Sequence, residues 1–144
     1  MLGVASVRAA CVAAGATGAC VAAAIACNRL LEKGKITRQP LKKKVAAVSA
    51  GIVKGETLLD LCYVEDAAAD VDCNVVLTED GEFVEIQGSG EEATFTEPQL
   101  HSMLEVSRKG IRELCALQDQ VIQAAMKPAS GGQLQNLASF FAKK

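Results

Sequence analysis

The feature that most constrains the fold is one long apolar stripe in the last third of the chain. Thr96, Glu97 and Pro98 predict the start of a helix, because Thr caps free amides, an acid suits the positive end and Pro suits the first turn. Apolar residues then recur at steps of three, four and seven, which is typical of a helix that buries one face. They are Leu100, Met103, Leu104, Ile111, Leu114, Cys115, Val121 and Ile122. A stripe of this length needs a sheet to dock on.

The middle of the chain supplies strands for that sheet. Apolar runs flank a Lys54-Gly55 turn, and a second pair flanks Asp80-Gly81, a strong hairpin signal. The first run is apolar on both faces, so we expect it in the interior of the sheet. Between the hairpins, residues 65–71 predict one or two helical turns. The expected strands are residues 45–53, 57–64, 73–79 and 82–88.

A second helix is expected ahead of the strands, from Ala13 to Leu31. Its surface is rich in Ala, which allows close packing, and Gly34 suits the left-handed conformation that ends many helices. Two helices and two hairpins predict an α+β fold, with the sheet packed against both helices. At 144 residues the chain is long enough for one core. We expect a divergent N-terminal segment at 1–14, a domain at 15–126 and a flexible tail at 127–144.

The cysteines and the first residues bear on the compartment. The six cysteines include no CxxC pair and the chain has one His, His101, so they predict buried thiols in a reducing compartment. We expect a cytoplasmic protein, with an organellar or nuclear location as the alternative. Ala and Gly dominate residues 1–31, which are too weakly hydrophobic to predict a membrane helix, so no membrane partner is expected.

The charged residues are divided between two segments. Thirteen of the seventeen acidic residues lie between Glu56 and Glu97, a stretch without Lys or Arg. Six basic residues lie between Lys33 and Lys44. Because this segment contains no aromatic residue, it favours contact with RNA phosphates over stacking on bases. The alternative is that both segments are solvated surfaces, and the fold decides whether they face the same ligand.

Two carboxylates, Asp66 and Asp72, are the candidate chemical site. They flank a short turn that leads into a strand, so they are able to converge. Mg²⁺ prefers a few carboxylate oxygens, keeps most of its waters and bridges to a phosphate. Such an ion would neutralise the charge that develops when a phosphodiester is displaced. The alternative is a solvated acidic turn, with Asp70 and Glu65 as neighbours or competitors.

The same carboxylates lie inside a run that resembles ribonuclease PH, a family of phosphorolytic 3′ exoribonucleases. The run is GIVKGETLLDLCYVEDAAADVDCNVVLTEDGEFVEIQGSGEEATFTEPQL, in which an Asp-x5-Asp element precedes N-V-V and V-E-I-Q-G strands. The likeness continues into LEVSRKGIRELCALQ and extends upstream through LLEKGKI and VAAVSAGIV. It covers about residues 15–125 and matches the C-terminal half of the family's domain.

The resemblance implies an activity, a site and partners. The family's reaction is attack of inorganic phosphate on the terminal phosphodiester, which releases a nucleoside diphosphate and shortens tRNA precursors. Asp66 and Asp72 would be its catalytic and metal-binding residues, with Mg as cofactor and inorganic phosphate as co-substrate. The partners would be the RNA 3′ end and ribonuclease PH-like subunits, in a homo- or hetero-oligomer. A non-catalytic subunit that pairs with full-length relatives is the alternative.

The sequence departs from the family at the phosphate site. The family's Gly-Gly-Thr-Arg segment is replaced by Ala9-Ala10-Cys11-Val12, so the hydroxyl and the bidentate guanidinium are both missing. Thr17 and Gly18 match the family's Thr-Gly at the helix start, where backbone amides would face an anion. The N-terminal half of the family's domain is also absent. We therefore expect the isolated chain to be inactive.

The tail carries a separate motif. LQNLASFFAKK resembles the PIP box by which replication proteins bind the sliding clamp PCNA, with Leu137, Phe140 and Phe141 as anchors. The family's leading Gln falls at Leu134, so one anchor is missing. The alternative is a short amphipathic helix that packs on its own domain.

Overall fold

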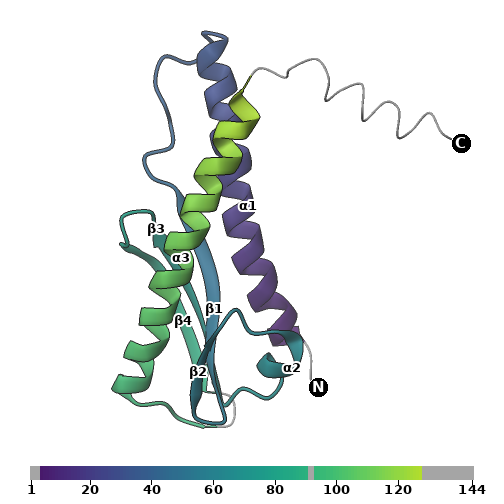
Figure 1. The fold of residues 1–144 in the computed structure, drawn as a ribbon, viewed down its shortest axis with the longest axis vertical. Helices are drawn as coiled ribbons and strands as arrows, with labels where there is room; N and C mark the ends of the chain where they lie inside the picture. The colour runs from purple at the N-terminus through teal and green to yellow at the C-terminus, as the bar shows by residue number, and fades with distance from the viewer. Residues whose placement is uncertain (1–3, 91–92, 128–144) are drawn as a thin grey trace, which may run out of the picture.

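The computed structural model describes residues 4–90 and 93–127, and of residues 4–13 it describes the backbone only. Three helices and four strands alternate along the chain (Figure 1), which confirms the predicted α+β class. The elements are α1 (Val4–Glu32), β1 (Val45–Val53), β2 (Glu56–Leu59), α2 (Tyr63–Asp66), β3 (Val71–Thr78), β4 (Phe83–Gly90) and α3 (Glu97–Met126).

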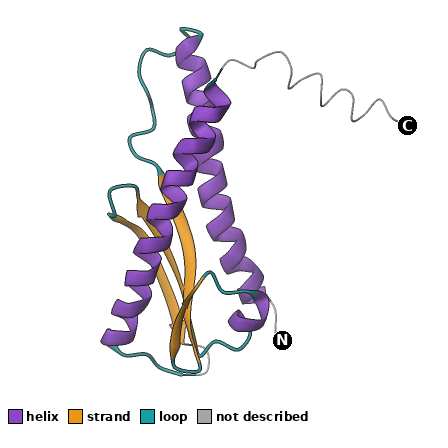
Figure 2. Ribbon diagram, in the orientation of Figure 1, coloured by secondary structure: helices purple, strands orange, loops and turns teal. Residues whose placement is uncertain are grey.

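The four strands form one antiparallel sheet in the order β2-β1-β3-β4 (Figure 2). The prediction that residues 45–53 form an interior strand is confirmed, because β1 pairs with both β2 and β3. Side chains alternate between the two faces of a strand, so every second residue of β1 and β3 points toward α3. The core between this face and α3 contains Ala46, Val48, Ala50, Ile52, Val71, Cys73, Val75, Leu77, Met103, Ile111 and Cys115.

Helix α1 closes one edge of the sheet. Strand β2 pairs only with the last four residues of β1, which leaves the first half of β1 without a neighbouring strand on that side. There the amide of Ala47 donates to Thr17 Oγ1 at 3.2 Å, and the amide of Val45 donates to Cys20 Sγ at 3.4 Å. Gln118 Nε2 joins the two helices, donating to the carbonyls of Thr17 and Val45 at 3.0 and 2.9 Å. Side-chain acceptors thus replace the missing strand.

Three boundaries differ from the sequence predictions. Helix α1 begins at Val4 rather than near residue 13, so the backbone of the expected separate segment continues the helix. Strand β2 ends at Leu59 rather than at residue 64, because Asp60 has a positive φ of 58° and turns the chain away. Helix α2 is a single turn that begins at Tyr63, ahead of the expected 65–71. It begins there because Glu65 accepts a hydrogen bond from the Cys62 amide at 2.9 Å.

The cap of α3 is confirmed, but its buried stripe is shorter than predicted. Thr96 Oγ1 accepts from the Gln99 amide, and the Gln99 side chain accepts from the Thr96 amide, a reciprocal capping box. Burial on the helix runs from Met103 to Gln118, and Val121 is 51% exposed. The reason is visible in Figure 1, where the C-terminal part of α3 extends beyond the sheet and lies beside α1.

One stretch of α1 meets the length and composition of a membrane span. Ala14–Glu32 does so near the N-terminus, with 11% of it buried. The same stretch places Cys20 and Ala24 in the interior against β1 and α3. Length and composition do not separate a membrane helix from a domain helix. The expectation of no membrane partner therefore stays a prediction.

Candidate carboxylate site

The candidate site lies on the face of the sheet that points away from α3. Because side chains alternate, Asp72 and Asn74 share this opposite face of β3 while Cys73 points into the core. Two rows of neighbours cross the sheet at these positions. They are Gly51–Asp72–Ser89 and Ser49–Asn74–Gln87. The face is thus polar where the opposite face is apolar.

Asp72 has a buried carboxylate oxygen without a partner. Its Oδ1 makes no hydrogen bond among the described residues. Burial is the main cause that raises the pKa of Asp72, the hydrogen bond from Ser89 opposes it, and the charge of Asp66 raises the pKa further. The charge of Asp66 thus acts on Asp72, and the convergence of the two carboxylates on one cation stays a prediction.

Helix α2 fixes the position of Asp66. The Asp66 amide donates to the Cys62 carbonyl at 2.9 Å, and the Glu65 carboxylate accepts from the Cys62 amide. The hydrogen bond from the Cys62 amide, and after it one from the Cys62 side chain, lower the pKa of Glu65. The Glu65 carboxylate is thus engaged at the start of the helix, which argues against its role as a competing ligand.

The loop between the two aspartates is held against β1. The Asp70 amide donates to the Ile52 carbonyl at 2.8 Å, which ties the end of the loop to the sheet. The ion pairs among the described residues include neither Asp66 nor Asp72. Neither carboxylate is therefore neutralised by a basic side chain of the described residues.

Gly51 makes room beside Asp72 for a packed side chain. A methyl group at Gly51 would lie 2.6 Å from the Val71 carbonyl oxygen and 2.7 Å from Leu61 Cδ1. Both distances are shorter than real Cβ atoms show. Only glycine therefore allows Leu61 to cover β1 at the row that contains Asp72.

These residues fit a magnesium site with few protein ligands. No group of three or more His, Cys, Asp or Glu side chains among the described residues gathers as a metal cage. Mg²⁺ does not need one, because it binds through one or two carboxylates and keeps several waters. A carboxylate oxygen such as Oδ1 of Asp72, without a hydrogen-bond partner among the described residues, is the kind of donor that it prefers.

Asn74 is a polar residue of this face that our sequence analysis missed. Its Oδ1 is buried and has no hydrogen-bond partner within residues 4–90 and 93–127, like Oδ1 of Asp72. The signal was available, because a residue two positions after Asp72 on a strand must share its face. An amide oxygen is also a suitable ligand for a hard cation.

The expected position of Thr17 and Gly18 is wrong. Both lie well inside α1, which begins at Val4, and not at a helix start. Amides inside a helix donate to carbonyls four residues earlier, so these two do not face an anion. The Thr17 side chain instead accepts from the amide of Ala47. The replacement segment Ala9–Val12 is likewise helical in its backbone.

The PIP-box-like motif lies outside the described residues. Leu137, Phe140 and Phe141 belong to it, and PCNA binding through them stays a prediction. His101 is exposed, and its Nε2 lies 3.6 Å from Oε1 of Glu105 on α3.

Comparison with known proteins identifies the class. Residues 44–110, which include both aspartates, match the model of domain 2 of the 3′ exoribonuclease family. Ribonuclease PH of Corynebacterium glutamicum is 59% identical over 102 residues, which cover 71% of this chain and 42% of the relative. Ribonuclease PH of Exiguobacterium sibiricum is 50% identical over 109 residues, covering 76% and 44%. An archaeal exosome core aligns with a TM-score of 0.48 and 23% identity, covering 58% of this chain and 32% of that one.

Residues 44–110 are thus similar to domain 2 of the 3′ exoribonuclease family. Within that family, the predicted resemblance to the C-terminal half of ribonuclease PH is confirmed. The chain spans less than half the length of these curated relatives.

Proposed function

We propose that this chain supplies the carboxylate half of the active site in a ribonuclease PH-type phosphorolytic 3′ to 5′ exoribonuclease that trims tRNA 3′ ends. The observation that carries the proposal is the buried Oδ1 of Asp72, which has no hydrogen-bond partner among the described residues, on a carboxylate whose pKa the charge of Asp66 raises. The ribonuclease PH names of the relatives support the choice of reaction.

In the proposed reaction, an oxygen of inorganic phosphate attacks the phosphorus of the terminal phosphodiester. The bond from that phosphorus to the 3′ oxygen of the preceding nucleotide breaks, and the terminal nucleotide leaves as a nucleoside diphosphate. The shortened RNA keeps a 3′ hydroxyl, whose proton comes from the attacking phosphate. Asp66 and Asp72, with the amide oxygen of Asn74 as a third donor, would hold Mg²⁺, which supplies charge neutralisation at the phosphodiester.

A role in cation binding also accounts for the raised pKa of Asp72. Burial and the charge of Asp66 make Asp72 costly to ionise, and a bound cation would remove that cost. Cation binding should therefore release a proton from Asp72 and strengthen as the pH rises through its raised pKa. In this proposal, ionised Asp72 lowers the stability of the free domain and raises its affinity for the cation.

The phosphate site is proposed to come from elsewhere. The Gly-Gly-Thr-Arg segment of the family is replaced here by Ala9–Val12, and Thr17 already accepts a hydrogen bond from β1. We therefore expect no phosphorolysis by this chain alone, and activity only in an oligomer with ribonuclease PH-like subunits.

A domain exchange tests the proposal. Residues 44–126 of this chain replace the matching segment of the Corynebacterium glutamicum ribonuclease PH, and release of nucleoside diphosphate from a tRNA with extra 3′ nucleotides is measured. The chimera should be active with phosphate, and Asp66→Asn or Asp72→Asn should abolish the release. Asp60→Asn is the matched control, because Asp60 is exposed and its positive φ suits Asn equally. Full activity of the Asp72→Asn chimera would refute the proposal.

A second candidate, a non-catalytic subunit that pairs with full-length relatives, is favoured by β4. All eight residues of this edge strand are exposed, and they include the apolar Phe83, Val84 and Ile86. An open apolar edge is a surface on which another chain can add. Light scattering of the chain with and without an intact ribonuclease PH tests this role, and a monomer in both samples would exclude it.

A further inference from the structure

The basic connection between α1 and β1 divides into two parts in the structure. Its last two residues, Lys43 and Lys44, are paired with the acidic turn that joins β3 and β4. Lys43 Nζ lies 2.9 Å from Asp80 and also contacts Glu82, while Lys44 Nζ lies 3.0 Å from Glu79 and also contacts Asp119. The two charged segments of the sequence therefore neutralise each other at this point.

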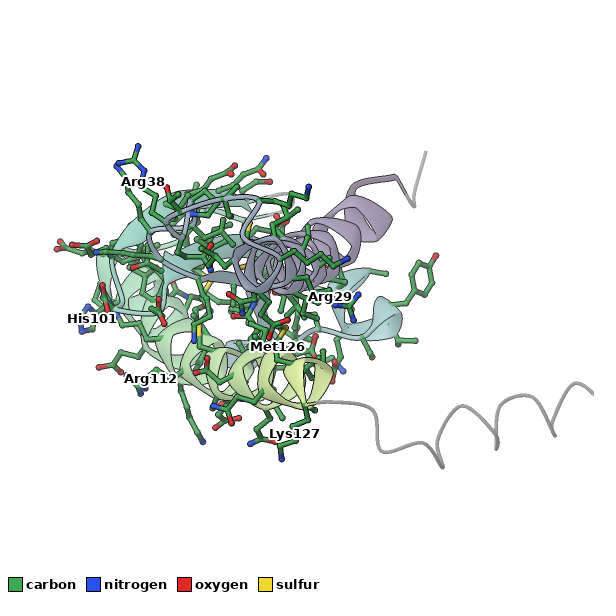
Figure 3. The ribbon with its side chains drawn as sticks, turned by 90° about the horizontal axis from the view of Figure 1, so that it is seen from above. Arg29, Arg38, His101, Arg112, Met126 and Lys127 are labelled. Atoms are coloured by element: carbon green, nitrogen blue, oxygen red, sulfur yellow. The ribbon has the colours of Figure 1, made fainter. Side chains whose placement is uncertain are left out.

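The four other cations of the connection remain exposed. They make no ion pair with any described residue. Figure 3 shows Arg38 pointing outward, away from the ribbon. We call these four residues the free basic set: Lys33, Lys35, Arg38 and Lys42.

The connection that carries the free basic set has a defined shape. Gln39 Nε2 donates to Asn28 Oδ1 at 2.8 Å, and its Oε1 accepts from the Leu41 amide at 3.3 Å. The amide of Lys35 donates to the Leu30 carbonyl at 2.9 Å, which anchors the other end to α1. The residues from Ile36 to Pro40, with Lys42, border a hollow of about 720 Å³. Arg38 and Lys42 thus border one concave surface, and Lys33 and Lys35 lie where the same connection leaves α1.

We propose that the free basic set is a binding surface for the phosphate backbone of single-stranded RNA. Four free cations in one segment without an acid attract a polyanion through counterion release. No aromatic side chain lies between residues 33 and 44, so the contact is with phosphates and independent of base sequence.

The position of the free basic set suits RNA that enters the carboxylate site by its 3′ end. The Glu79 amide donates to the Lys44 carbonyl at 3.0 Å, so the connection meets the end of β3 opposite to Asp72. Asp72 and Thr78 are six residue steps apart along β3, which corresponds to roughly 20 Å at about 3.3 Å per residue. The free basic set would therefore hold nucleotides upstream of the end that reacts. This assignment of the polyanion rests on the proposed function.

Salt-dependent binding of a fluorescein-labelled oligouridylate to the full chain tests the inference. The variant K33Q/K35Q/R38Q/K42Q should lower the slope of log K against log salt by about 0.7 per lost phosphate contact, or about 2.8 for four. The control K54Q/K109Q/R112Q/K127Q removes the same number of exposed Lys and Arg residues elsewhere. Its slope should stay at the wild-type value, and equal unfolding midpoints show that all three proteins are folded.

Three results would overturn the inference. The first is equal salt slopes for the two variants, and the second is no RNA binding by the wild-type chain at low salt. The third is that K33Q/K35Q/R38Q/K42Q loses binding to phosphatidylserine vesicles as strongly as it loses binding to RNA, which would indicate a membrane surface. Asp72→Asn separates this inference from the proposed function, since it should leave the salt slope unchanged. An inactive chimera with an intact salt slope would remove the reaction and leave the RNA surface standing.

Discussion

Replacing Gly51 by alanine is the sharpest test of how the carboxylate site is packed. The added methyl group would lie 2.6 Å from the Val71 carbonyl oxygen and 2.7 Å from Leu61 Cδ1. Val71 precedes Asp72 on β3, and its backbone is fixed by pairing with β1 and β4. Overpacking of this kind costs about 1–3 kcal/mol. Reduced freedom of the unfolded chain offsets about 0.4–1 kcal/mol of that cost. We expect a net loss of about 1–2 kcal/mol in the free energy of unfolding.

Urea unfolding followed by circular dichroism measures this loss, with Gly110→Ala as the matched control. A methyl group at Gly110 would lie 2.8 Å from Leu59 Cδ2, the far end of a side chain that is able to move. Alanine also gains up to about 1 kcal/mol over glycine inside a helix, so this variant should unfold near the wild-type midpoint. If Gly51→Ala is as stable as wild type, the close packing of Leu61 over β1 is wrong.

Three further predictions concern stability. Met103→Ala should cost about 2–5 kcal/mol in thermal or urea unfolding, because this side chain is fully buried between α3 and the sheet; a cost below about 1 kcal/mol would contradict the core assignment. Thr96→Ala should cost about 1 kcal/mol by removing the capping box of α3, whereas Thr96→Ser should cost less; equal losses would argue against the cap. Burial raises the pKa of Asp72 in the folded state above its ordinary value of 3.8, so its contribution to stability falls as pH rises through that window. Asp72→Asn should therefore gain stability relative to wild type at pH 7 and lose the gain at pH 3, and a pH-independent difference would count against the buried charge.

Local signals in the sequence predicted most of the elements. The Thr96 cap, the Asp80-Gly81 turn and the left-handed Gly34 each depend on a few neighbouring residues, and all three are present in the structure. The interior position of β1 followed from its apolar residues on both faces. These features follow from backbone conformation and alternation, which a single sequence displays directly.

Features that depend on distant contacts were not predictable in the same way. Gln118 looks like a surface residue in sequence, but it is buried because it joins α3 to α1 and to β1. The position of Thr17 was wrong because its hydroxyl serves the open edge of β1, a gap that exists only because β2 is short. The spacing of Asp66 and Asp72 selected them as a candidate pair, whereas Asn74 required the faces of β3 to be known.

Binding of Mn²⁺, an oxygen-seeking probe for the proposed Mg²⁺ site, tests the central claim most directly. Electron paramagnetic resonance counts free and bound ion during titration of the chain at pH 7. We predict that wild type and the Asp60→Asn control bind one ion that Mg²⁺ displaces, and that Asp66→Asn and Asp72→Asn bind none. Equal Mn²⁺ binding by all four proteins would contradict the claim that these two aspartates together hold a divalent cation.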